Sequence, residues 1–301
     1  MSGNTDPIQP PKRQRCVVIT GASSGIGRAS ADAFARMGWH VIGTGRDEDR
    51  CRDAAGQIAA VAANGGCVDF LRGDFTEMRD VLRVAHEIGE LTDRVDVLIN
   101  NAGGVRDGQY RTSEGLEATF AANHLAPFLL TRELMPLLER AAGESPPGLV
   151  RVIAVSSAGH AACQGMRWYD LNMDTAFDAN AAYCQAKLAN LLFARELDRH
   201  VRDRGVISLA MHPGRVASNF ASHADEKMQA WMAANESVPP EQPARTLVWL
   251  ATAVELGGMG GRYFHELAEE QPALQAQDDT AAAKLWTESE KMLDRILAVA
   301  H

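Results

Sequence analysis

Short apolar runs alternate with longer amphipathic stretches along most of the chain. The runs are three to five residues long and rich in Val and Ile, and the stretches between them are long enough for helices. Such runs predict buried strands, and such stretches predict helices. Seven strands are expected, at residues 16–20, 40–44, 68–71, 95–99, 151–155, 206–210 and 262–264. A last helix is expected at about residues 279–299.

This alternation predicts an α/β protein with a Rossmann-type, doubly wound, seven-stranded parallel sheet covered by helices on both faces. We find no linker that would divide the chain, so residues 15–301 are expected to form a single dinucleotide-binding and catalytic domain. Residues 1–14 are polar and contain three prolines, which predicts a disordered leader. Two irregular segments, at about 159–180 and 220–243, are expected to form a small substrate lobe.

Composition limits the kinds of partner that the protein is expected to bind. The formal net charge is −9, which argues against nucleic acid as a partner because such binding depends on clustered Lys and Arg. The five cysteines fit neither a disulfide framework nor a Cys-x-x-Cys metal site, and the nine histidines show no ligand spacing, so no metal is expected. No apolar stretch near the start has signal or membrane length. A cytoplasmic location without membrane attachment is expected.

Tyr183 and Lys187 are the first candidates for chemistry. They are four residues apart in an expected helix and therefore share one face. An ammonium group beside a phenol favours the ionised phenol, which makes Tyr183 a candidate proton donor. The alternative is a solvated lysine beside a half-buried tyrosine, because long helices contain such pairs by chance.

A glycine-rich loop, Gly21-Ala-Ser-Ser-Gly-Ile-Gly27, joins the first expected strand to the first expected helix. In an open parallel sheet this turn lies where ligands bind, and the helix N-terminus offers N–H groups to a phosphate. The loop predicts a dinucleotide cradle, and a tight turn without a ligand is the alternative. The cradle would be formed by Gly21, Ser23, Ser24, Gly25, Ile26 and Gly27.

Three motifs in this order resemble the short-chain dehydrogenase/reductase superfamily: Thr20-Gly-x-x-x-Gly-Ile-Gly27, Asn100-Asn-Ala-Gly103 and Tyr183-x-x-x-Lys187. Residues 123–131, 183–190, 212–218 and 261–264 are similar to the retinol dehydrogenase-like branch, and the resemblance covers residues 15–297. It implies a nicotinamide cofactor at the carboxyl edge of the sheet. It also implies homo-oligomers that pair through the helices near 125–138 and 183–197, although the segment 159–180 is placed to block that face.

The resemblance assigns further cofactor contacts. Asn101, Ala102 and Gly103 would lie beside the adenosine half, and Asp74 and Phe75 would contact the adenine. Pro213, Gly214, Val216 and Ser218 would receive the carboxamide and the pyrophosphate. Turns at the ends of strands are the alternative for the Asn100-Asn101 and Pro213-Gly214 pairs.

Arg46 bears on the choice of cofactor. An acid at the end of the second strand accepts from the ribose 2′-hydroxyl of NAD, whereas an Arg there accommodates the 2′-phosphate of NADP. In this chain Gly45 stands where the NAD-preferring relatives place an acid, and Arg46 follows it. The sequence therefore favours NADP(H) over NAD(H). In the alternative, Arg46 neutralises a surface acid and Asp47 takes the ribose.

The expected reaction is hydride transfer between nicotinamide and a carbonyl or alcohol. It leaves an alkoxide, which needs a proton and stabilisation near neutral pH. Tyr183 would donate the proton, and Lys187 together with the positive nicotinamide ring would lower its pKa. Lys187 would also bind the nicotinamide ribose, and Ser157 would hydrogen-bond the substrate oxygen. Ser156 is the weaker candidate for this contact with the substrate oxygen. His124 is expected to contribute packing or a polar contact rather than chemistry. By resemblance, Asn123 would hold a water through its backbone carbonyl; a helix kink is its alternative role.

The substrate is expected to be bulky and apolar or aromatic. Ser157 and Tyr183 are 26 residues apart, and the segment between them carries aromatic and sulfur-containing side chains, as does segment 220–243. These side chains are Cys163, Met166, Trp168, Tyr169, Met228, Trp231 and Met232. They are equally suited to the core of a small lobe. An epimerase or lyase on the same fold and a non-catalytic nucleotide-binding regulator are the competing functions.

Overall fold

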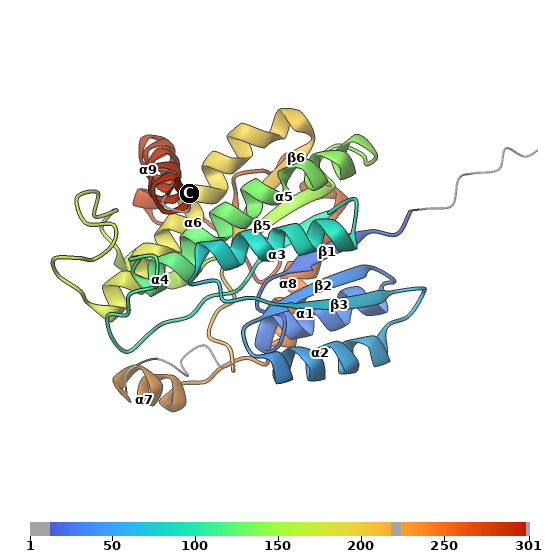
Figure 1. The fold of residues 1–301 in the computed structure, drawn as a ribbon, viewed down its shortest axis with the longest axis horizontal. Helices are drawn as coiled ribbons and strands as arrows, with labels where there is room; N and C mark the ends of the chain where they lie inside the picture. The colour runs from blue at the N-terminus through green and yellow to red at the C-terminus, as the bar shows by residue number, and fades with distance from the viewer. Residues whose placement is uncertain (1–12, 218–223, 225, 299–301) are drawn as a thin grey trace, which may run out of the picture.

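The structure, a computed structural model, describes residues 13–217, 224 and 226–298. In this part of the chain, helices cover both faces of an eight-stranded sheet with the order β3-β2-β1-β4-β5-β6-β7-β8 (Figure 1). The strands are β1 (Cys16–Ile19), β2 (His40–Gly45), β3 (Cys67–Arg72), β4 (Val97–Asn100), β5 (Val150–Val155), β6 (Val206–Met211), β7 (Tyr263–His265) and β8 (Ala268–Glu269). The doubly wound α/β fold is confirmed.

The sheet separates two apolar cores because successive side chains of a strand point to opposite faces. In β1, Val17 and Ile19 pack into one core, and Cys16 and Val18 into the other. The first core lies under α1 (Gly25–Arg36), α2 (Glu48–Val61) and α8 (Glu241–Thr252). The second lies under α3 (Met78–Leu91), α5 (Ala126–Gly143), α6 (Ala179–Val201) and α9 (Asp279–Ala298).

The strand order changes direction between β1 and β4. β1 leads away through β2 to β3, whereas β4 leads through β5 and β6 to the other edge. The helices that follow β1 and β4 therefore leave on opposite faces, and a crevice forms outside the carboxyl ends of these two neighbours. The glycine-rich loop follows β1, and Asn101 follows β4, so both border this crevice.

The seven predicted strands are confirmed as parallel strands, and the structure adds an eighth strand at one edge. β8 pairs antiparallel with β7, with Phe264 opposite Glu269 and His265 opposite Ala268. The two residues of the connecting turn, Glu266 and Leu267, have φ values of 46° and 64°. A two-residue hairpin turn of this kind usually carries Asn or Gly. Glu and Leu give no such indication, so the sequence did not predict the hairpin.

The leader prediction lies mostly outside the described residues, which begin at Arg13. The two leader residues that the structure describes contact the body of the protein. Arg13 forms ion pairs with Asp93 and Glu144, and Gln14 donates to the carbonyl oxygens of Gly38 and Gly65. Arg13 and Gln14, which the sequence predicted to belong to the leader, are thus held against the folded domain by side-chain contacts.

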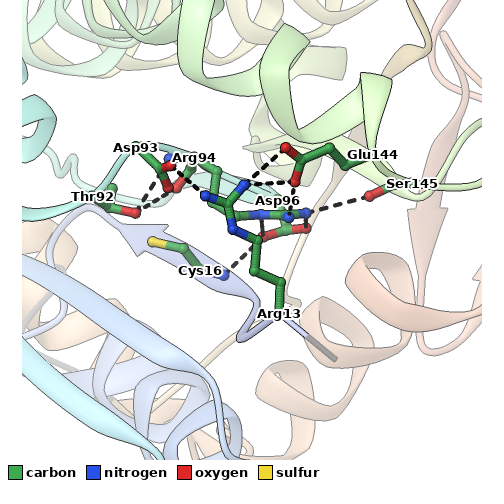
Figure 2. A network of polar contacts seen from close by, with 8 residues as sticks. All are labelled: Arg13, Cys16, Thr92, Asp93, Arg94, Asp96, Glu144 and Ser145. Atoms are coloured by element: carbon green, nitrogen blue, oxygen red, sulfur yellow. Dashed lines mark hydrogen bonds and ion pairs between the residues drawn. The ribbon is translucent and has the colours of Figure 1, made fainter. Parts of the chain in front are cut away.

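A network of charges joins the loops at the amino edge of the sheet (Figure 2). The Arg94 guanidinium donates to Asp96 at 2.6 and 3.1 Å and to Glu144 at 2.7 Å. Asp96 also accepts from the backbone N–H of Cys16 at 2.8 Å. These contacts tie the start of β1 and the start of β4 to the end of α5, on the side of the sheet opposite to the crevice.

The last helix, α9, packs against α5 and α6. Its Trp286 ring lies 4.7 Å from the Phe128 ring and 6.1 Å from the Phe193 ring, measured between centroids. None of the helices within the described residues is long and apolar enough to cross a membrane. Likewise, no group of three or more His, Cys, Asp or Glu side chains in this part of the chain could hold a metal ion.

Candidate active site

A cleft of about 630 Å³ runs along the carboxyl ends of the central strands. It contains every predicted site residue that the structure describes except Gly27. These are Gly21, Ser23, Ser24, Gly25, Ile26, Arg46, Asp74, Phe75, Asn101, Ala102, Gly103, Asn123, Ser157, Tyr183, Lys187, Pro213, Gly214 and Val216. Ser218 lies outside the described residues. The fold thus brings together side chains that are as far apart in the chain as Gly21 and Val216.

The glycine-rich loop has the backbone that a phosphate cradle requires. Gly21 and Gly25 have φ values of +68° and +55°, which glycine adopts without strain. A Cβ atom on Gly27 would lie 2.4 Å from the Gly21 carbonyl oxygen, so residue 27 serves close packing rather than lining the cleft. Helix α1 starts at Gly25, and the Ser24 side chain does not cap it, which suits its first N–H groups to an anion.

Thr20 and Asn101 lock the ends of β1 and β4 together. The Thr20 hydroxyl oxygen accepts from the backbone N–H groups of Asn101 and Ala102, each at 2.9 Å. The Asn101 amide donates to the Thr20 carbonyl oxygen at 2.8 Å. Asn101 therefore shapes the turn at the strand end and also lines the cleft, while its contact with the adenosine half stays a prediction. Thr20 stands at the start of the glycine-rich motif in the sequence, but no role was predicted for it.

The adenosine end of the cleft lies at the end of β2. A Cβ atom on Gly45 would lie 2.6 Å from Cys51 Sγ and 2.9 Å from Ser23 Oγ, so a side chain does not fit there without movement. Arg46 lines the cleft next to it. Asp47 instead caps α2, where its carboxylate accepts from the Arg50 N–H at 2.9 Å. Asp47 is therefore engaged as a helix cap and does not line the cleft.

The proposed catalytic side chains come from three elements. Ser157 follows β5, and its side chain hydrogen-bonds Tyr183 of α6. Lys187 Nζ lies 5.6 Å from the centroid of the Tyr183 ring and donates to the Val155 carbonyl oxygen at 3.1 Å. Ser156 instead donates to the Lys187 carbonyl oxygen at 2.7 Å, which makes it a buried support of α6.

Asn123 lies in a π-helical turn, Ala121–Leu125, between α4 (Ala118–Phe120) and α5. Residue 127, which would donate an N–H to the Asn123 carbonyl in an α-helix, is a proline and has none. The Asn123 side chain donates to the carbonyl oxygens of Thr119 and Gly104 at 2.8 and 3.0 Å. The helix is thus interrupted at Asn123, as π turns often are at functional sites.

Burial dominates the electrostatics of the site. It raises the pKa of the Tyr183 phenol, and the hydrogen bond with Ser157 opposes that shift. Burial lowers the pKa of Lys187 to about 8. From the sequence, Lys187 and the positive nicotinamide ring together are expected to lower the tyrosine pKa; in the protein alone, burial acts in the opposite direction. Spacing along a helix indicates that two side chains are near each other. It does not show how deeply they are buried, and burial is what shifts their pKa values here.

A nicotinamide dinucleotide fits this set of residues. The uncapped N-terminus of α1 offers N–H groups to a phosphate, and Pro213 and Gly214 line the same cleft as Ser157 and Tyr183. Gly103 has a φ of +155°, and a Cβ there would lie 2.3 Å from Asn123 Oδ1. Glycine therefore lets the loop after β4 pack closely on Asn123.

Comparison with known proteins agrees with this geometry. Residues 15–170 match the short chain dehydrogenase family. The chain belongs to the short-chain dehydrogenase family. Members of the family are NAD(P)-dependent oxidoreductases, and the fold, the glycine-rich loop and the catalytic side chains described above all belong to that class.

The short-chain dehydrogenase relatives match nearly the whole chain. Retinol dehydrogenase 13 of Homo sapiens is 34% identical over 290 residues, which cover 93% of this chain and 84% of the relative. Polyprenol dehydrogenase of Mus musculus is 36% identical over 290 residues, which cover 94% and 84%. The solved RhlG/NADP active-site complex of Pseudomonas aeruginosa aligns with a TM-score of 0.66 and 26% identity, covering 83% of this chain and 93% of that one. The resemblance to retinol dehydrogenases is confirmed.

Several residues predicted for the substrate lobe of this short-chain dehydrogenase do not line the cleft. Met166 is buried in the core, Trp168 packs against it beneath Lys284, and the Tyr169 side chain is exposed. Cys163 packs beside Cys184, which does line the cleft. The segment 159–180 therefore serves mainly as the core of a small lobe. Segment 220–243 is described only in part, and the side chains of Met228, Trp231 and Met232 lie outside that description.

Two histidines have roles near the site that the sequence did not indicate. His160 contacts the Ser157 carbonyl oxygen, and His212 accepts from the Gly214 N–H at 3.3 Å. Their partners are two or three residues away, in loops whose shape no periodic pattern predicts. His124, expected to be a packing neighbour, is fully buried and lies 2.7 Å from the Ser289 hydroxyl; burial lowers its pKa to about 3.

Proposed function

We propose that this short-chain dehydrogenase is an NADP(H)-dependent carbonyl reductase or alcohol dehydrogenase that acts on bulky apolar substrates. The single observation that carries the proposal is the arrangement of Ser157, Tyr183 and Lys187 in one cleft with the glycine-rich loop. When bound, the nicotinamide supplies or accepts the hydride. The side chains of this chain bind and orient the substrate oxygen and move its proton.

Ser157 and Tyr183 would both contact the substrate oxygen. Their side chains already hydrogen-bond each other, so an oxygen placed between them can accept from both hydroxyl groups. Because burial raises its pKa, the phenol carries its proton near neutral pH and can give it to a developing alkoxide. In alcohol oxidation the same oxygen would have to accept a proton, which requires the phenolate to be stabilised.

Lys187 would stabilise that phenolate. It is buried beside the Tyr183 ring, and no carboxylate among the described residues lies within ion-pair distance of it. Its positive charge is therefore directed at the phenol and at any ribose hydroxyl in the cleft. Asn123, at the interrupted helix, would hold a water that connects Lys187 to solvent. This role is supported by the nearness of the two side chains, because a Cβ on Gly103 would contact both.

The preference for NADP(H) rests on the end of β2. Residue 45 has no room for an acid that would accept from a ribose 2′-hydroxyl, and Asp47 is engaged as a helix cap. The guanidinium of Arg46 at the cleft suits a 2′-phosphate, with which it can form charge-assisted hydrogen bonds. The solved RhlG/NADP complex among the similar structures is consistent with this assignment.

The preference for a bulky apolar substrate rests on the tyrosine end of the cleft. Val105, Cys184 and Val216 line it, and Gly159 leaves space beside the Tyr183 ring. The relatives named for retinol and polyprenol dehydrogenation support the same class of substrate. Soft and apolar walls of this kind accept a hydrophobic aldehyde, ketone or alcohol.

A panel of carbonyls and alcohols, measured side by side with NADPH and NADH, tests the function. We expect turnover with NADPH and with hydrophobic aldehydes or ketones. Reduction of small hydrophilic carbonyls alone would contradict the substrate class. A substrate that is converted without any net change in nicotinamide absorbance would instead indicate an epimerase or lyase, and nucleotide binding without conversion would indicate a regulator.

Arg46→Ala tests the cofactor preference, with Arg50→Ala as the matched control on the exposed start of α2. Loss of a charge-assisted contact should raise the KM for NADPH by about tenfold or more while the KM for NADH stays unchanged. The control should change neither constant. Equal losses with both cofactors would show that Arg46 does not contact the 2′-phosphate.

A further inference from the structure

His160 lies in the short 3-10 helix Ala158–Ala162 that directly follows Ser157, and its residue is only 4% exposed. Its Nδ1 is 2.7 Å from the Ser157 carbonyl oxygen, and its Nε2 is 3.1 Å from the backbone nitrogen of Ala273. A carbonyl oxygen only accepts, and a backbone N–H only donates. Nδ1 therefore carries the hydrogen, Nε2 accepts, and the neutral ring uses both of its nitrogens.

These contacts fix the backbone of Ser157 from several sides. The Ser157 carbonyl oxygen also accepts from the backbone N–H of His160 at 3.1 Å, and the serine hydroxyl oxygen accepts from the Gly159 N–H at 3.0 Å. The segment around Ala273 supports the turn a second time, because the Gln275 amide donates to the carbonyl oxygens of His160 and Cys163. Residues more than 100 positions later in the chain thus hold the loop that carries Ser157.

The ring of His160 is held in one orientation by its neighbours. The Tyr263 ring meets it edge-on, with 5.4 Å between centroids and an interplanar angle of 77°. His212 packs on the same tyrosine with 5.5 Å between centroids. The imidazole is therefore confined at the position where its Nδ1–H meets the serine carbonyl.

We propose that His160 is a positioning residue for Ser157: it ties the serine carbonyl to the backbone of Ala273 and so holds the serine hydroxyl against Tyr183. This inference rests on the proposed function, in which Ser157 and Tyr183 share the substrate oxygen. Small errors in the placement of reacting groups reduce rates strongly. An apolar side chain of similar size would fill the space between Tyr263 and the turn, but it would leave the serine carbonyl without this donor.

Two substitutions test the roles of the two ring nitrogens of His160 separately. In His160→Asn, the amide nitrogen can take the place of Nδ1 and donate to Ser157, while the acceptor for Ala273 is lost. In His160→Gln, the longer side chain reaches the position of Nε2, while the donor to Ser157 is lost. His40→Gln is the control, because His40 is a partly buried histidine at the start of β2 that pairs with Asp69 on the amino side of the sheet.

Steady-state kinetics and NMR of the full chain with bound NADP⁺ provide the readouts. The protein contains four tyrosines, so ¹³Cζ-tyrosine labelling gives a simple spectrum in which Tyr183→Phe assigns the Tyr183 resonance. We expect His160→Gln to lower kcat by about tenfold, to leave the KM for NADPH unchanged, and to move that resonance. His160→Asn should restore kcat and the resonance position, and His40→Gln should change neither.

Equal losses of kcat in the Asn and Gln variants, with the Tyr183 resonance unmoved, would overturn the assignment and leave His160 as a packing residue. Unchanged kcat in both variants would overturn it as well. Failure of the proposed function is seen separately, as wild-type protein that oxidises no NADPH with any carbonyl of the panel. The Tyr183 resonance still decides in that case whether His160 acts on the Ser157–Tyr183 pair.

Discussion

At the amino edge of the sheet, Arg94 and Asp96 are buried together, and the Arg94 guanidinium donates two hydrogen bonds to the Asp96 carboxylate (Figure 2). At the carboxyl edge, Lys187 is buried just as deeply but donates to the carbonyl oxygen of Val155. No carboxylate among the described residues pairs with it. Arg151 of β5 is also buried without a carboxylate partner, but it donates to the carbonyl oxygens of Gly148, Leu250 and Ala253 and does not line the cleft. Among the described residues, Arg94 is thus a buried cation with a counter-ion, whereas Lys187 is a buried cation without one that lines the cleft.

The difference shows which edge serves stability and which serves chemistry. A charge that is buried with its counter-ion has little freedom to act on anything else. A charge buried against neutral groups keeps its field for a ligand or for a neighbouring proton, at a cost to the stability of the fold. On this argument, substitutions at the carboxyl edge should change turnover more than stability, and substitutions at the amino edge should do the reverse.

Tyr183→Phe should give the largest effect on turnover. Loss of a general acid lowers kcat by about 10²–10⁴-fold. The fold should be little affected, because the phenol makes one described side-chain hydrogen bond, with Ser157, and the ring remains in place. The free energy of unfolding should stay within about 1 kcal/mol of the wild type. Carbonyl reduction with NADPH and urea unfolding measure the two quantities.

Binding of NADPH is the control for Tyr183→Phe. The glycine-rich loop and Arg46 are untouched by the substitution, so the dissociation constant should remain near that of the wild type. Wild-type turnover in this variant would place the proton donor elsewhere. A parallel fall in stability and turnover would remove the distinction between the two edges.

Asp96→Asn should show the opposite behaviour. It removes one charge of the buried pair, leaves Arg94 with Glu144 at the rim, and should cost about 3–5 kcal/mol of unfolding free energy. The asparagine carbonyl can still accept from the Cys16 N–H, so the start of β1 keeps its hydrogen bond. Urea unfolding measures the loss, and kcat per folded molecule should be unchanged. A large loss of kcat in a fully folded variant would contradict this assignment.

The pH dependence of stability tests Lys187. Burial lowers its pKa from 10.5 to about 8, so between these values the unfolded state binds more protons than the folded state. Stability therefore rises with pH across this window, by on the order of 3 kcal/mol for a full shift. Above pH 10 the raised pKa of Tyr183 acts in the opposite direction, because the unfolded tyrosine loses its proton first.

The Lys187→Met variant removes the ammonium group, so its comparison with the wild type isolates the contribution of Lys187 to the pH dependence of stability. The difference in unfolding free energy between wild type and variant, measured by urea unfolding from pH 7 to pH 10, should shift in favour of the wild type as pH rises above about 8. A difference that stays constant over this range would mean that Lys187 keeps an ordinary pKa in the folded protein. Its isolation from counter-ions would then have no energetic consequence.

The sequence predicted what depends on local pattern. The strands, the phosphate loop with its glycines and the tyrosine-lysine spacing all lie within short segments, and the fold places them as expected. It did not predict the hairpin at Glu266 and Leu267, whose residues are unusual for such a turn. The contact of His160 with Ala273 joins residues 113 positions apart, and no periodicity reports it.

The pKa of Tyr183 in the protein alone could not be predicted from the sequence for a related reason. Its direction depends on how much water the site excludes, which is a property of packing from several elements rather than of one helix. The capping role of Asp47 also needed the structure, because it is visible only in its bond to the Arg50 N–H. Local chemistry can be inferred from sequence, whereas burial and competition between partners cannot.

Arg13→Ala should give the smallest effect, and it sharpens the comparison within the amino edge itself. Arg13 pairs with Asp93 and Glu144, but about half of its side chain is exposed, so solvent screens the pair. Exposed ion pairs contribute little to stability. The urea midpoint should be indistinguishable from that of the wild type, in contrast to Asp96→Asn in the same network. If the two variants were equally destabilised, burial would not be what separates strong from weak pairs at this edge. There would then be no basis for inferring that Lys187 acts on the cleft because it is buried there without a counter-ion.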